Sequence, residues 1–153
     1  MNDEWEQVIK ELPKMFEEFL LCPLRSRNRL SNAPQKGVYT FYEDGKALYV
    51  GRSDKLKTRV REHGRPSSGH NTAPFAFNLA KEAMRNQDID TANTPRSKLE
   101  QEPVFKKAFV KAKERVARMK IRFAEIDDPI KQTLFEVYAA MKLDTPYNDF
   151  RTH

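Results

Sequence analysis

The chain has 153 residues, a length that suits one domain with a hydrophobic core of useful size. Charged residues make up 33% of it and the formal net charge is +6, which favours an anionic partner, most commonly nucleic acid. A single cysteine excludes an internal disulfide and a cysteine-rich metal site, and three scattered histidines are too few for a histidine-built zinc site. Without a membrane-length apolar run or a basic signal start, we expect a soluble cytoplasmic protein with no membrane contact.

The first part of the chain predicts a helix, a loop and a hairpin. Asp3 can cap a helix over the first twenty residues, and Pro13 inside it predicts a kink or two abutting helices. Residues 22–36 contain prolines and arginines and predict an extended loop. Alternating strands are expected at 38–42 and 47–50.

The remainder predicts mainly helices. A helix capped by Ser53 or Asp54 is followed by a polar surface loop over residues 65–73. Further elements are expected as helices at 75–84 and 103–119 and a strand at 121–126. Asp127 or Asp128, together with Pro129, is expected to open a last helix that buries Ile130, Leu134, Val137 and Met141.

This order indicates a small α/β (α+β) protein with a mainly antiparallel three-stranded sheet flanked by helices. We expect a single domain over residues 1–153. Within it, residues 1–36 form an N-terminal helical extension and loop, residues 37–148 form the core, and a helical insertion lies around 75–118.

Two short strings mark the predicted hairpin, Gly37-Val38-Tyr39 and Tyr49-Val50-Gly51. A two-residue turn at Asp44-Gly45 would pair Tyr39 with Val50 and send the tyrosines to opposite faces. A three-residue turn over 43–45 would place Tyr39 directly across from Tyr49, and this is the register we expect. Strand tyrosines commonly serve only packing, but a glycine at each hairpin end indicates close approach of another backbone or a ligand.

Arg59 and His63 lie four residues apart and therefore share a face of the next predicted helix. An arginine fork suits phosphate oxygens, and a histidine can move a proton. The simpler alternative is a solvated basic helix. Four neighbouring cations are better suited to neutralising a nucleic-acid backbone than to catalysis: Arg52, Lys55, Lys57 and Arg61.

Taken in order, these elements resemble the GIY-YIG nuclease superfamily. That family also has a glutamate on a later helix and usually an asparagine after it. Here Leu134-Phe135-Glu136-Val137-Tyr138 and Thr145-Pro146-Tyr147-Asn148 look like this closing signature. The resemblance covers about residues 37–148, and Val38 and Val50 replace the isoleucines of the family name.

The resemblance implies a metal-dependent endonuclease that hydrolyses phosphodiester bonds. Glu136 would bind one divalent metal ion, Mg²⁺ or Mn²⁺, and Arg59 would hold the scissile phosphate. Tyr39 and His63 would activate the attacking water, with the proton acceptor left open between them. Tyr49 would position substrate or metal-bound water, and Asn148 would brace the site by hydrogen bonds.

Other polar residues indicate how substrate is held. The loop after His63 offers Arg65, His70 and Asn71. A row on the long helix either tracks a phosphate backbone or serves solubility, and comprises Lys107, Lys111, Arg115 and Arg118.

The expected substrate is DNA, with RNA left open as the alternative. Because the sequence shows no attached zinc finger or helix-turn-helix, we expect recognition of a DNA structure, in repair, recombination or defence against foreign DNA. A targeting partner protein is an alternative source of specificity. Two other functions stay open, a non-catalytic nucleic-acid-binding module of the same fold and a general protein-interaction domain.

Overall fold

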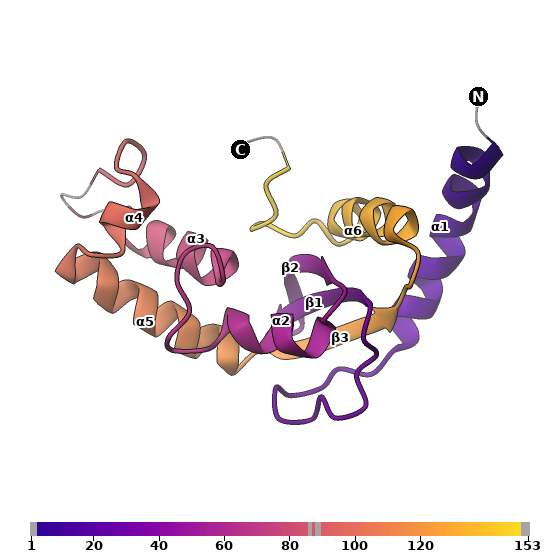
Figure 1. The fold of residues 1–153 in the computed structure, drawn as a ribbon, viewed down its shortest axis with the longest axis horizontal. Coiled ribbons are helices and arrows are strands. Elements are labelled where there is room, and N and C mark those ends of the chain that lie inside the picture. Colours follow the sequence, from indigo (N-terminus) through magenta and orange to yellow (C-terminus); the bar gives the residue numbers. More distant parts are fainter. Residues whose placement is uncertain (1–2, 86, 88–89, 151–153) are drawn as a thin grey trace. The chain divides into compact units, whose positions relative to one another are not determined.

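The computed structural model describes residues 3–85, 87 and 90–150 (Figure 1). The chain forms two compact units. The first comprises residues 1–58 and 120–153, and the second comprises residues 59–119. No helix in the described part of the chain is both long and apolar enough to cross a bilayer.

The first unit is built on a three-stranded antiparallel sheet, as predicted. Its strands are β1 (Gly37–Glu43), β2 (Lys46–Ser53) and β3 (Lys120–Glu125), in the spatial order β2-β1-β3. β1 pairs on both sides, so its residues are buried from Gly37 to Tyr42. The fold class is therefore α+β, with β2 and β3 as the two edge strands.

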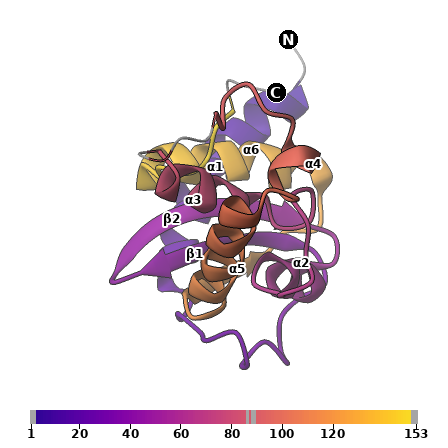
Figure 2. The same cartoon turned by 90° about the vertical axis from the view of Figure 1, so that its left-hand side faces the viewer.

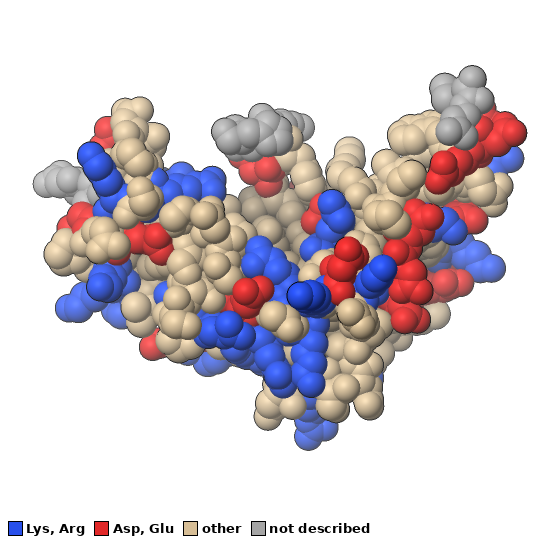
Figure 3. All heavy atoms as spheres, in the orientation of Figure 1, with Lys and Arg blue, Asp and Glu red and all other residues tan. Residues whose placement is uncertain are grey.

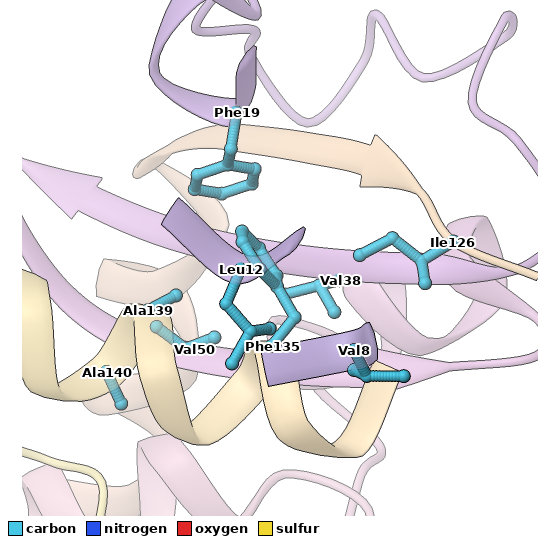
Figure 4. Packing of buried hydrophobic residues seen from close by; sticks show 9 residues of the cluster. All are labelled: Val8, Leu12, Phe19, Val38, Val50, Ile126, Phe135, Ala139 and Ala140. Atoms are coloured by element: carbon cyan, nitrogen blue, oxygen red, sulfur yellow. The ribbon is translucent and has the colours of Figure 1, made fainter. Parts of the chain in front are cut away.

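Helices α1 (Asp3–Leu21) and α6 (Pro129–Leu143) cover one face of this sheet. Val38 and Val50 point from the sheet into a buried cluster shown in Figure 4. The helices contribute Val8, Leu12, Phe19, Phe135, Ala139 and Ala140 to it. This core fixes α6, and with it Glu136, against the sheet.

α1 is a single helix that runs through Pro13, not two abutting helices. Pro13 lies on the exposed side, where the carbonyl that loses its helical N–H partner can face water.

The buried face of α6 differs from the predicted one. Ile130 and Met141 are 46% and 75% exposed, whereas Phe135, Ala139 and Ala140 are buried. Two alanines let the helix approach the sheet closely, so Ile130 and Met141 lie outside the contact, whereas Leu134 is partly buried and packs against the core as predicted. Asp128 caps the helix as expected, accepting from the N–H groups of Ile130 and Lys131.

The second unit is helical. It contains α3 (Pro74–Ala83), α4 (Arg96–Leu99) and α5 (Pro103–Ala117), and α2 (Leu56–His63) runs across the boundary between the units. α3 and α5 lie side by side (Figure 2). Phe77 joins them, with ring centroids 5.0 Å from Phe105 and 5.5 Å from Phe109.

Candidate active site

The two tyrosines lie on the same face of the sheet but are not directly opposite each other. Tyr39 pairs with Gly51, and Tyr49 pairs with Phe41. Cross-strand partners share a face, and so do residues two apart on one strand, so the tyrosines are diagonal neighbours.

The predicted three-residue turn is wrong. The strands are joined by Asp44 and Gly45 alone, whose φ angles of 51° and 79° are those of a tight two-residue hairpin turn. An irregularity between Phe41 and Tyr42 then shifts the register by one residue. This bulge keeps Tyr39 and Tyr49 on one face despite the two-residue turn, and neither predicted pairing occurs.

Both hairpin glycines are sites of close approach. A Cβ at Gly37 would lie 2.1 Å from the carbonyl oxygen of Ala124 on β3, so the neighbouring backbone requires a glycine there. A Cβ at Gly51 would lie 2.3 Å from Cζ and Oη of Tyr39. At the second position the close neighbour is a side chain, which the sequence did not indicate. Tyr39 itself is 1% exposed.

Glu136 lies on α6 beside Arg52 of β2. Its Oε1 is 4.0 Å from Nε of Arg52, and its side chain is 19% exposed. Burial raises the pKa of the Glu136 carboxyl, and the positive charge of Arg52 opposes this. Half-buried carboxylates with a raised pKa are typical of functional sites.

Asn148 is bound to the outer edge of β2. Its Oδ1 accepts from the Val50 N–H at 2.7 Å and its Nδ2 donates to the Val50 carbonyl at 2.8 Å. Thr145 donates its hydroxyl to the same Oδ1, and the Tyr147 N–H donates to the Leu48 carbonyl. Asn148 thus forms the expected hydrogen bonds, and its partner is the backbone of an edge strand.

Residues 49–52 of β2 adjoin several of this unit's candidates, which lie on both faces and at the outer edge of the strand. Tyr49 faces the same side as Tyr39, Val50 holds Asn148 at the edge, and Arg52 adjoins Glu136. Four strand residues span about 10 Å. Because side chains alternate along a strand, Arg52 lies on the same face of β2 as Val50, which is the face that α6 covers. Glu136 on α6 therefore approaches β2 from the face opposite the two tyrosines.

Arg59 and His63 belong to the second unit. Nη1 of Arg59 donates to the Thr72 carbonyl at 2.5 Å and lies 3.8 Å from Oε1 of Glu62. His63 is fully buried, and burial, assisted by the charge of Arg59, lowers its pKa to about 3. At neutral pH His63 is therefore uncharged.

The loop over residues 65–73 is fixed by two contacts that the sequence did not reveal. Nδ1 of His70 lies 2.5 Å from Oε2 of Glu100, whose Oε1 accepts from the His70 N–H. Lys113 is buried and donates from Nζ to the carbonyls of Pro66 and Ser68. His70 is thus paired within the protein, while Arg65 and Asn71 are exposed.

The other predicted nucleic-acid contacts lie on the surface to different degrees. The exposed ones are Arg52, Lys55, Lys107, Lys111 and Arg118, and the half-buried ones are Lys57, Arg61 and Arg115.

The charge is distributed unevenly over the first unit. Acidic side chains gather over α1, which carries three of them in its first turn (Figure 3). The loop over residues 22–36 carries three arginines and one lysine and no acidic residue. Its charge was visible in the sequence, although the loop was not assigned a binding role there. Arg25 is anchored to β3 by paired backbone hydrogen bonds with Ile121.

Few of the described side chains are placed to coordinate a metal ion together. Among the described residues, no three His, Cys, Asp or Glu side chains cluster to hold a metal ion. Magnesium keeps several waters and commonly binds through one or two carboxylates together with substrate phosphates. Glu136 alone is consistent with that mode of binding and not with a fully protein-built metal cage.

Comparison with known proteins gives no match to a family model, to a curated protein or to a solved structure. What is shown is the α+β fold with its three-stranded antiparallel sheet.

Proposed function

We propose that this protein is a GIY-YIG-type endonuclease that hydrolyses phosphodiester bonds in DNA with one divalent metal ion. The observation that supports this most is that β2 carries Tyr49 and contacts two other candidates. Asn148 hydrogen-bonds Val50 at the strand edge, and Glu136 adjoins Arg52 on the α6 face, opposite the face of Tyr39 and Tyr49. Phenol, carboxylate and amide groups at one strand offer proton transfer, cation binding and rigid support.

In this proposal each residue has one role. Glu136 would hold Mg²⁺ or Mn²⁺, which supplies charge stabilisation at the phosphate when bound. Arg59 binds the scissile phosphate and offsets its developing negative charge. Tyr49 positions substrate, and Asn148 holds β2 in place.

Hydrolysis forms a bond from the water oxygen to phosphorus and breaks one phosphorus–oxygen ester bond. The water proton must therefore pass to a base. His63 is buried with a pKa of about 3, and such a weak base takes up a proton poorly at neutral pH. The proposal therefore assigns the water proton to Tyr39 as a phenolate, which first loses its own proton to solvent, and assigns a positioning role to His63. The leaving oxygen takes its proton from solvent water.

Substrate binding is assigned to three exposed cations. Arg52, Lys55 and Arg65 would contact phosphates without reading sequence. Because such contacts carry no sequence information, the proposal assigns specificity to a DNA structure, such as a flap, nick or branch.

The test is a magnesium-dependent cleavage assay on duplex, nicked, flapped and single-stranded DNA, with RNA in parallel. Glu136→Ala and Arg59→Ala should each abolish cutting, whereas Glu114→Ala, an exposed glutamate on α5, should cut like wild type. Equal cutting by wild type and both site variants would identify a contaminating nuclease and reject the proposal.

A non-catalytic nucleic-acid-binding module is the second candidate. It is favoured by the burial of Tyr39 and His63, which keeps both side chains from bulk solvent. Salt-dependent DNA binding with no cutting of any substrate would establish it in place of the nuclease.

A further inference from the structure

A groove runs between α3 and α5 within the second unit. It has a volume of about 680 Å³, and the described residues that line it come from α3, α5 or the residue following α3. Leu79 and Met84 line one side, and Val104, which is 48% exposed, lines the other. The residues of the proposed nuclease site do not line it.

Two parallel rows on α5 give the groove its character. Val104, Ala108 and Ala112 recur every four residues and form an apolar, mostly small row. The adjacent row, also every four residues, is Lys107, Lys111 and Arg115. No acidic residue is among the described residues that line the groove.

These rows suit a helix as occupant. From residue 103 to residue 115, α5 extends about 18 Å, the length of roughly 12 residues of a second helix. Small residues such as Ala108 and Ala112 let another helix approach closely, and amphipathic helices bind in apolar grooves through residues spaced by three and four. The cationic row would meet acidic side chains at the edge of such a helix.

The same features disfavour single-stranded nucleic acid. Sites for unpaired bases combine cations with aromatic stacking surfaces. The apolar part of this groove is aliphatic: the side chains described as lining it include no aromatic ring.

We propose that the α3–α5 groove binds an acidic amphipathic helix of a partner protein. The basic row of α5 is then a protein-recognition feature, and the groove is where targeting by a partner would occur. The inference does not depend on the nuclease proposal.

The test uses the full chain and a fluorescent synthetic peptide of about 14 residues, with leucines spaced by three and four and glutamate elsewhere. A scrambled peptide of the same composition is the ligand control. We expect the amphipathic peptide to bind at least about tenfold more tightly than the scrambled one and to shift the methyl NMR signals of Leu79, Met84 and Val104.

Two variants separate packing from charge. Lys107→Glu with Lys111→Glu should weaken peptide binding about tenfold, whereas Lys98→Glu with Lys106→Glu, an equal charge change outside the groove, should not. Ala108→Arg adds positive charge but fills the groove, so it should weaken peptide binding. Circular dichroism verifies that each variant is folded.

Four outcomes would overturn the proposal. One is equal binding of the amphipathic and scrambled peptides. Another is methyl shifts confined to residues outside the groove. The third is stronger peptide binding by Ala108→Arg, and the fourth is displacement of the peptide by single-stranded DNA. Either of these two results would assign the groove to a charge-driven ligand.

Discussion

The ring of Tyr39 occupies the space that a side chain at position 51 would need. A Cβ on Gly51 would lie 2.3 Å from Cζ and 2.8 Å from Cε2 of that ring. The tyrosine of one string and the glycine of the other are therefore a single packing unit across two strands.

Gly51→Ala should accordingly destabilise the protein by about 1–3 kcal/mol, because the buried Tyr39 ring has to move. Urea unfolding measures the change. Gly45→Ala is the contrasting variant: its Cβ meets nothing within 4 Å but its φ of 79° is strained, so its cost should be about 1 kcal/mol.

A double-mutant cycle tests the cause. Once Tyr39→Ala removes the ring, adding Gly51→Ala should cost much less than it does alone. Strictly additive effects of Tyr39→Ala and Gly51→Ala would show that the ring is not what excludes a side chain from position 51.

Asn148→Ala removes two hydrogen bonds from the edge of β2, where the amide meets the N–H and carbonyl of Val50. We expect a loss of about 2 kcal/mol and faster amide exchange at Val50. Asn28→Ala, which removes an exposed contact with Ser26, should change stability by less than about 0.5 kcal/mol. A Val50 amide that exchanges at the wild-type rate would contradict this assignment.

His63 should make the protein sensitive to acid. Its folded-state pKa of about 3 lies below the ordinary value of 6.5, so the unfolded chain takes up the proton first. This contribution to stability is complete above pH 6.5 and falls as the pH drops toward 3, with a slope of up to about 1.4 kcal/mol per pH unit.

Unfolding free energies measured between pH 7 and pH 4 provide the test. His63→Gln, which cannot titrate, should flatten the decline even if it lowers stability at pH 7. His70→Gln, a change in the half-buried histidine paired with Glu100, is the comparison. An unchanged slope in His63→Gln would show that this residue is not the acid-sensitive group.

Glu136→Gln should separate stability from function. Burial raises the pKa of the Glu136 carboxyl, so its ionised form is disfavoured in the folded state above the ordinary pKa of 4.5. The neutral amide removes that cost, and the variant should be more stable at pH 7 yet unable to cut DNA with magnesium.

The difference in stability should vanish below pH 4, where both folded and unfolded carboxyls are protonated. Glu114→Gln, on an exposed part of α5, should match wild type at every pH. A Glu136→Gln protein that is less stable than wild type at pH 7 would mean that the carboxylate is a net stabilising group through Arg52.

Local patterns sufficed for the elements but not for their contacts. Asp128 and Pro129 predicted the start of α6 correctly because capping chemistry is local. The buried face of α6 was predicted only in part: Leu134 packs against the core, but closeness to the sheet selected Ala139 and Ala140 over Ile130 and Met141.

The site follows the same rule. The order of residues indicated that Tyr39 and Tyr49 share a face, but the pairing was wrong because the bulge after Phe41 leaves no mark in composition. The structural role of Lys113 was not predicted, because a lysine on a basic helix gives no sequence signal that its Nζ donates to two loop carbonyls.

The edge strands of the small sheet each carry hydrogen bonds from segments outside it. On β2 these come from Tyr147 and Asn148, and on β3 from Arg25 through Ile121. Open strand edges are templates on which chains add to one another and aggregate. By occupying these edges, the short segments limit self-association. Mutations in them are expected to lower the yield of monodisperse protein.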